Sequence, residues 1–150
     1  MGWLRRTPRA PKIEAPNPSE LEWVSSNVAI ARELVDSSTE GTPEPPELDA
    51  AYAAWFTDWR ARPAGERDDP NVFVNAFGLA FGQHLVDTLG LEWAIVTDEH
   101  GTEIAVHGQA GDVLVFPPNL VAKRLERGEM HFFEPLSREI GAQVRALGRG

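Results

Sequence analysis

Residues 91–118 read LEWAIVTDEHGTEIAVHGQAGDVLVFPP, and this stretch decides the fold class of the chain. It contains three short runs rich in β-branched and aromatic residues, which predict strands at 92–97, 102–107 and 112–116. The turn-forming segments between the runs, DEHG and HGQAGD, are too short for the crossover connection that parallel strands need. We therefore expect a three-stranded antiparallel meander.

Alternation along the three runs predicts which side chains share a face of this sheet. Successive residues of a strand point to opposite faces, so a single register fixes the whole buried set. Glu92, Glu103 and His107 should point away from that set. The buried face is expected to hold Trp93, Ile95, Ile104, Val106, Val113 and Val115.

A helix start precedes the sheet at Asn17-Pro18-Ser19-Glu20. It combines an N-cap residue, a proline at the first helical position and a glutamate three residues after the cap. We expect this helix to run to about Asp36. Its apolar stripe is predicted to hold Leu21, Val24, Val28, Ala31 and Val35.

Four further helical patterns complete the order of elements. The sequence predicts three helices before the meander and two after it, which is an α+β fold. Residues 1–16 are expected to form a disordered basic tail, and residues 17–150 a single domain. The further helices are predicted from Glu47 to before Pro63, at about 70–89 with Gly90 as C-cap, at 118–127 and at 134–147.

Two glycines interrupt the most apolar of these helices, in the segment NAFGLAFGQHL at 75–85. Glycine costs a helix interior about 1 kcal/mol relative to alanine, so Gly78 and Gly82 need a reason. Phe73, Phe77 and Phe81 lie on another side of the same helix, which makes it apolar nearly all round and therefore central. We expect the glycines to let a neighbouring helix or the sheet approach closely.

Composition limits the classes of function. The chain has 150 residues, 42% of them hydrophobic, a net charge of −9 and no cysteine. Its positive residues are concentrated at the start, where Arg5, Arg6, Arg9 and Lys12 occur, so the rest is strongly acidic and disfavours nucleic-acid binding. No apolar run is long enough to span a membrane, and the lack of cysteine fits a reducing compartment. We expect a cytoplasmic protein.

The middle and C-terminal parts resemble a bacterial domain-of-unknown-function family. The resemblance is carried by FGLAFGQHLVDTLGLEWAIVTDEHGTEIAV and GDVLVFPPNLVAKRLERGE, within roughly residues 71–145. The shared features are an FG-containing helix, a G-x-x-W entry to a sheet, and a strand that runs into prolines and a short helix rich in Lys and Arg. The resemblance implies mainly a fold, because it brings no established catalytic residue.

The reactive residue types form no recognisable catalytic or metal motif. His84, His100, His107 and His131 include no pair at the i, i+4 spacing of helical zinc ligands. There is also no G-x-S-x-G elbow, no phosphate-binding loop, and no strand before the glycines that would make a dinucleotide fingerprint. We therefore predict no catalytic residue, no cofactor and no metal ligand.

Four residues remain as weak candidates for contact with a ligand or partner. Arg124 and Arg127 are spaced i, i+3 and suit an anion, although positive charge in a last helical turn more often meets the helix dipole. His84 and Trp93 are the candidates near the sheet.

The leading hypothesis is a non-catalytic bacterial interaction domain, immunity-like or regulatory, that binds a protein partner through an acidic surface. The alternative is a small ligand-binding protein or enzyme that uses His84 and polar groups near the sheet. A deep pocket with converging polar side chains would favour the alternative. The sequence predicts no oligomeric state.

Overall fold

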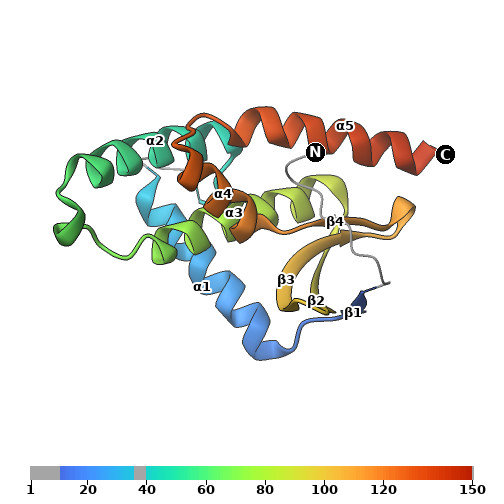
Figure 1. Cartoon of the computed structure of the whole chain (residues 1–150). Coiled ribbons are helices and arrows are strands. Elements are labelled where there is room, and N and C mark those ends of the chain that lie inside the picture. The colour runs from blue at the N-terminus through green and yellow to red at the C-terminus, as the bar shows by residue number, and fades with distance from the viewer. Residues whose placement is uncertain (1–10, 36–39, 150) are drawn as a thin grey trace.

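The computed structural model describes residues 11–35 and 40–149 and confirms the α+β class (Figure 1). Three α-helices precede the meander and two follow it, as the sequence predicts, with boundaries that shift by a few residues. Two short 3₁₀ helices, η1 and η2, lie in the connections. In chain order the elements are β1 (Lys12–Glu14), α1 (Pro18–Leu34), α2 (Pro45–Ala61), η1 (Ala64–Glu66), α3 (Asn71–Leu89), β2 (Glu92–Asp98), β3 (Gly101–Gly108), η2 (Ala110–Asp112), β4 (Val113–Val115), α4 (Pro117–Arg127) and α5 (Phe133–Arg149).

The sheet has four strands within the described residues, so the expected number of three is wrong. Its order is β1-β2-β3-β4, and every neighbouring pair is antiparallel. The extra strand, β1, pairs with β2 at the sheet edge, where Ile13 lies opposite Val96. The sequence predicts residues 1–16 to be disordered, and this is wrong for the residues of β1. Residues 1–10 lie outside the described residues, so for them it stays a prediction.

The predicted register of the meander is confirmed. Trp93 lies opposite Val106, Ile95 opposite Ile104, and Val106 opposite Val115, so the six predicted side chains share one face. Glu92, Glu103 and His107 lie on the other face, as expected. That other face is not simply solvated, because it also carries four buried apolar side chains: Ala94, Val96, Ala105 and Leu114.

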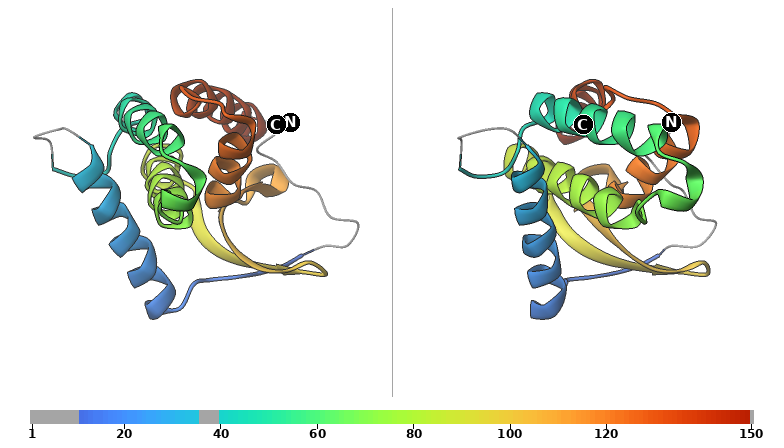
Figure 2. Two further views of the ribbon diagram at one scale, coloured as in Figure 1. Left: turned by 60° about the vertical axis from the view of Figure 1, so that its left-hand side comes forward. Right: turned by 90° about the vertical axis from the view of Figure 1, so that its left-hand side faces the viewer.

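Helix α3 lies at the centre of the molecule, as its apolar composition predicts. It contacts α1, α2, α4 and α5, and Figure 2 shows α2 and α5 side by side on the side away from the sheet. Val24 and Val28 of α1 pack on Leu79 of α3. Leu21, predicted in the same stripe of α1, is 44% exposed, so that part of the prediction is wrong.

The space between α2, α3 and α5 is filled by rings, here called the aromatic cluster. Tyr52 is fully buried at its centre, with the centroids of five neighbouring rings 5.1–6.0 Å away. Asp49, one turn earlier on α2, accepts hydrogen bonds from the backbone N–H groups of Phe133 and Glu134, at 2.8 and 3.0 Å. The start of α5 is therefore capped from another helix. The neighbouring rings are those of Trp55, Phe56, Phe77, Phe132 and Phe133.

The two glycines of α3 mark the place where α4 begins. A Cβ atom on Gly78 would lie 2.7 Å from Cα of Pro118 and 2.9 Å from the carbonyl oxygen of Pro117. A Cβ atom on Gly82 would meet the ring of Trp93 and, at 2.8 Å, Cγ of Pro117. The expectation that the glycines permit close approach is confirmed, and both a helix and a sheet residue make that approach.

No helix in residues 11–35 or 40–149 combines the length and hydropathy needed to cross a bilayer.

Candidate functional site

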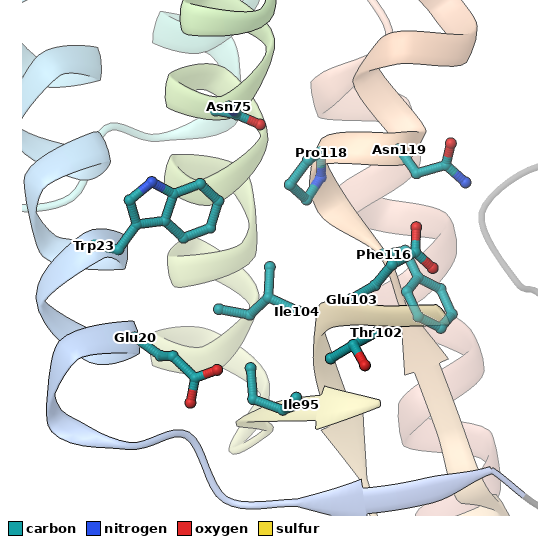
Figure 3. Close-up of a pocket in the computed structure, with 10 residues that line it drawn as sticks. All are labelled: Glu20, Trp23, Asn75, Ile95, Thr102, Glu103, Ile104, Phe116, Pro118 and Asn119. Carbon is teal, nitrogen blue, oxygen red and sulfur yellow. The ribbon is translucent and has the colours of Figure 1, made fainter. Parts of the chain in front are cut away.

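A pocket of about 340 Å³ lies where α1, α3, the sheet and the start of α4 meet (Figure 3). Trp23 and Glu20 face it from α1, and Glu103 and Asn119 lie on the opposite side, toward α4. Ile104 projects between these two sides. The described residues that line it are Glu20, Trp23, Asn75, Ile95, Thr102, Glu103, Ile104, Phe116, Pro118 and Asn119.

The wall from α1 is built by the predicted helix start. The side chain of Asn17 accepts a hydrogen bond from the backbone N–H of Glu20, and the Glu20 carboxylate accepts one from the backbone N–H of Asn17, both at 2.8 Å. This capping box holds one carboxylate oxygen of Glu20 at the helix start. Trp23 follows three residues later and is 43% exposed, which is unusual for so large an apolar side chain.

The wall from α3 and α4 depends on Gly78. The close approach of Pro118 to that glycine brings Pro118 and Asn119 opposite Asn75, which lies one turn earlier on α3. Prolines at 117 and 118 have no N–H group, so the start of α4 has lost two of the donors that make helix N-termini attractive to anions. Pro118 therefore supplies the apolar part of this wall, and Asn75 and Asn119 supply its polar amide groups.

The floor is formed by the paired strands β2 and β3. Ile95 and Ile104 lie opposite one another, and both are partly buried. The hydroxyl oxygen of Thr102 lies 3.2 Å from that of Thr97 on the neighbouring strand, which fixes the Thr102 side chain. The lining thus combines an apolar floor with polar groups at its margin.

The electrostatics of the pocket are one-sided. Among the described residues, its lining includes the carboxylates of Glu20 and Glu103 but no lysine, arginine or histidine. Two carboxylates beside an apolar surface attract a positively charged group, because the protein surface lowers the effective dielectric constant around them. The described residues of the lining also include no serine, cysteine or histidine, the usual members of a nucleophile–base pair.

The weak candidates His84 and Trp93 lie outside the lining of this pocket. The indole N–H of Trp93 donates to Oε1 of Gln83 at 2.9 Å, and its ring packs against Gly82. His84 is half-buried on α3, and burial lowers the pKa of its imidazole, against opposite contributions from Glu44 and Asp87. Trp93 thus has a structural role in joining the sheet to α3.

Arg124 and Arg127 also lie outside the pocket, and the structure places them in different surroundings. Arg124 is only 7% exposed, and its Nε atom is 3.8 Å from a carboxylate oxygen of Glu129. Burial lowers the pKa of the Arg124 guanidinium, opposed mainly by Glu129. Arg127 is exposed. One guanidinium is thus buried and the other exposed, and an anion contact by either stays a prediction.

The comparison with protein families concerns the part of the chain that forms most of the pocket. Residues 62–134 match the domain of unknown function DUF3806. The resemblance to a domain-of-unknown-function family is confirmed, over a segment that starts earlier and ends earlier than expected. The DUF3806 segment contains α3, the meander and α4, and so supplies all of the described lining residues apart from Glu20 and Trp23.

Searches of curated proteins and of solved structures found no match to the chain.

The residues that line the pocket come from α1, α3, β2, β3 and the start of α4, and the sequence patterns did not predict this combination. One signal was present: Trp23 lies off the predicted apolar stripe of its helix, and a tryptophan in that place calls for an explanation.

Proposed function

We propose that the chain is a non-catalytic interaction domain that binds a protein partner at the pocket between α1, α3 and the sheet. The observation that carries this proposal is the exposed ring of Trp23 beside an apolar floor with Glu20 and Glu103 at its margin. Tryptophan is among the residues that contribute most to binding energy at protein interfaces. An immunity-like or regulatory role in a bacterial cytoplasm agrees with this arrangement.

Further exposed apolar side chains support a surface larger than the pocket itself. Ile30 is 36% exposed and lies two helical turns after Trp23, on the same flank of α1. Val72 is 53% exposed and lies on α3, one turn before Asn75 of the lining. Exposed apolar side chains gathered around a pocket favour a macromolecular partner over a small molecule alone.

The charge of the chain supports a partner with a basic contact surface. The net charge of −9 and the acidic lining would speed the approach of a positively charged protein and repel nucleic-acid phosphates. The lack of cysteine, and the excess of arginine over lysine that is typical of GC-rich bacterial genomes, agree with the proposed cellular setting.

A second candidate function is a small ligand-binding protein or enzyme that uses His84. The lowered pKa of this half-buried imidazole favours its neutral form, which can accept a proton. Asp87 accepts hydrogen bonds from Gln83 and Thr42, at 2.8 and 3.0 Å, so polar groups are present on the same helix. A small molecule that the wild type and Trp23→Ala bind or convert, and that His84→Ala does not, would favour this candidate.

Affinity capture with matched variants tests the interaction-domain proposal. The full chain, Trp23→Ala and Leu147→Ala serve as baits in extract from the native host. Leu147 is 43% exposed, like Trp23, but lies on α5, away from the pocket. We expect a protein that the wild type and Leu147→Ala retain and Trp23→Ala loses. Retention of the same proteins by all three baits would contradict the proposal.

A further inference from the structure

The face of the sheet that points away from α3, here called the outer face, carries a buried apolar cluster. Val96, Ala105 and Leu114 are 1%, 0% and 8% exposed, and Phe116, which follows β4, packs with them. Ile13 of β1 packs against the margin of this cluster. Antiparallel sheets commonly leave one face to solvent, so burial this complete on the outer face needs a cause.

The described helices do not cover this cluster. Figure 2 shows them on the other side of the sheet, where Trp93 and Ile104 pack against α1 and α3. Side chains stand roughly perpendicular to a sheet, so neighbours on the same strands cover their flanks and leave their tips open. The tips of Val96 and Leu114 therefore need cover from a further segment of the chain.

Residues 1–10, which lie outside the described residues, enter the sheet directly beside this cluster. They lead through Pro11 into β1, where Ile13 lies opposite Val96. Ten residues span up to about 33 Å when extended, and the three steps from β1 to β4 cover about 14 Å. The segment is therefore long enough to cross the whole sheet. Residues 36–39, by contrast, join two helices on the other side.

The sequence of this segment, MGWLRRTPRA, suits an apolar surface with an acidic margin. Trp3 and Leu4 are large apolar side chains in an otherwise polar stretch, and their burial would be favourable in proportion to the area removed from water. Pro8 and Pro11 keep the residues before them extended, which suits a segment that lies across strands.

The charges of the segment and of the outer face are opposite. Residues 1–10 carry three arginines, and alternation along the hairpin places three carboxylates on the outer face. Oε2 of Glu103 is buried, and both Glu103 and Asp98 interact within the chain. Buried carboxylate oxygens are ordinarily hydrogen-bonded, and a guanidinium supplies donors of opposite charge. The arginines are Arg5, Arg6 and Arg9, and the carboxylates are those of Glu92, Asp98 and Glu103.

We propose that residues 1–10 bind the outer face of their own sheet, with Trp3 and Leu4 over the buried cluster and the arginines at its acidic margin. This assignment replaces the expectation of a disordered tail for these residues. It is independent of the proposed function, because it concerns the face opposite Ile95 and Ile104, which form the pocket floor. While the segment is bound, a protein partner approaches the pocket from the Trp23 side.

A spin label on the full chain tests this assignment. The chain has no cysteine, so Thr7→Cys offers one place for a nitroxide, which broadens the NMR signals of nearby amides. We expect the amide signal of Leu114, on the strand farthest from β1, to lose most of its intensity and to regain it when ascorbate reduces the label. The signal of Asp58 on α2 should keep its intensity. Equal intensities at Leu114 and Asp58 would overturn the proposal.

Matched substitutions in the labelled chain test the side chains that hold the segment. Trp3→Ala should restore most of the Leu114 signal, and R5Q/R6Q/R9Q should restore part of it. Trp23→Ala, the same change at the pocket, should leave the broadening as it is. Broadening that stays unchanged in both Trp3→Ala and R5Q/R6Q/R9Q would overturn the assignment of these side chains.

Mixed samples distinguish the chain's own sheet from that of a second copy. Isotope-enriched protein without the label is mixed with spin-labelled protein of natural isotope content. The Leu114 signal should stay sharp in this mixture, because the segment binds within its own chain. Broadening in the mixture would place the segment on another molecule and overturn the intramolecular assignment.

Discussion

The aromatic cluster and the pocket lie on different sides of α3 and use apolar side chains in opposite ways. In the aromatic cluster, Tyr52 is fully buried among rings, and the carboxylate of Asp49 caps a helix. At the pocket, Trp23 stays 43% exposed beside the carboxylates of Glu20 and Glu103. The first region uses its polar groups for stability, and the second leaves the apolar surface of Trp23 accessible. This difference separates residues that hold the fold from residues suited to binding.

The largest effect is expected where α4 packs on α3, at the wall of the pocket. Gly78→Leu places side-chain atoms where backbone atoms of Pro117 and Pro118 lie, and backbone cannot yield as a flexible side chain does. Overpacking of this kind should lower the free energy of unfolding by about 3 kcal/mol. Chemical denaturation measures the loss.

The matched control is Gly148→Leu on α5, where nothing lies within 4 Å of an added Cβ atom. Its free energy of unfolding should stay within about 0.5 kcal/mol of the wild type. Equal losses in both variants would show that glycine at 78 serves no close contact.

Removing the cap of α5 should have the next largest effect. Asp49→Ala leaves the backbone N–H groups of Phe133 and Glu134 without their acceptor, which should lower the free energy of unfolding by about 2 kcal/mol. Asp58→Ala, an exposed change on the same helix, should cost less than about 0.5 kcal/mol. If Asp49→Ala had the denaturation midpoint of the wild type, the cap by Asp49 would not stabilise the fold.

A smaller effect of opposite sign is expected for Tyr52→Phe. The ring contacts remain, but the buried hydroxyl, which has no hydrogen-bond partner among the described residues, is removed. Stability should rise by up to about 1 kcal/mol at pH 7. Burial also raises the pKa of Tyr52 to about 12, so the wild type should lose stability above pH 10 and through pH 12. Tyr52→Phe should lose less stability in this pH range, because it has no hydroxyl to ionise. If the variant were less stable than the wild type at pH 7, the Tyr52 hydroxyl would have a hydrogen-bond partner.

The smallest effect concerns His84, which lies on α3 outside the described lining of the pocket. Burial lowers its pKa in the folded state, so its favourable contribution is present above the unfolded pKa of 6.5 and is lost as the pH falls through the folded value. His84→Gln should flatten the decline in melting temperature below pH 6.5. His100→Gln, in the exposed turn between β2 and β3, should keep the wild-type pH profile.

Local patterns predicted most of the fold because each depends on neighbours in the sequence. The meander and its register follow from the alternation of apolar residues and from the turn residues between the strands. The C-cap follows from Gly90 itself, which adopts the left-handed conformation with a φ of 67°. Strand β1 was missed because the three residues Lys12–Glu14 carry no pattern of their own and pair only once β2 exists. The burial of Leu21 was predicted wrongly because this residue lies in the first turn of its helix. There, a shift of one residue in the helix start changes which side chains face the core.

The pocket could not be predicted in the same way, because its residues come from distant segments. Trp23, Asn75, Ile104 and Pro118 meet only after α1 and α4 have both packed against α3. The candidates that the sequence favoured were reactive residue types. The structure places Trp93 against Gly82 and Arg124 beside Glu129, both outside the described lining of the pocket.

The cap on α5 also bears on the order of folding. The meander forms between neighbours in the chain, whereas the bond from Phe133 to Asp49 closes a loop over a separation of 84 residues. Loop closure of that length costs entropy before any contact repays it, so we expect this bond to form late, after the rate-limiting barrier. Asp49→Ala should therefore speed unfolding and leave the folding rate nearly unchanged. The lifetime of the native state would then depend on a carboxylate outside the segment that matches DUF3806.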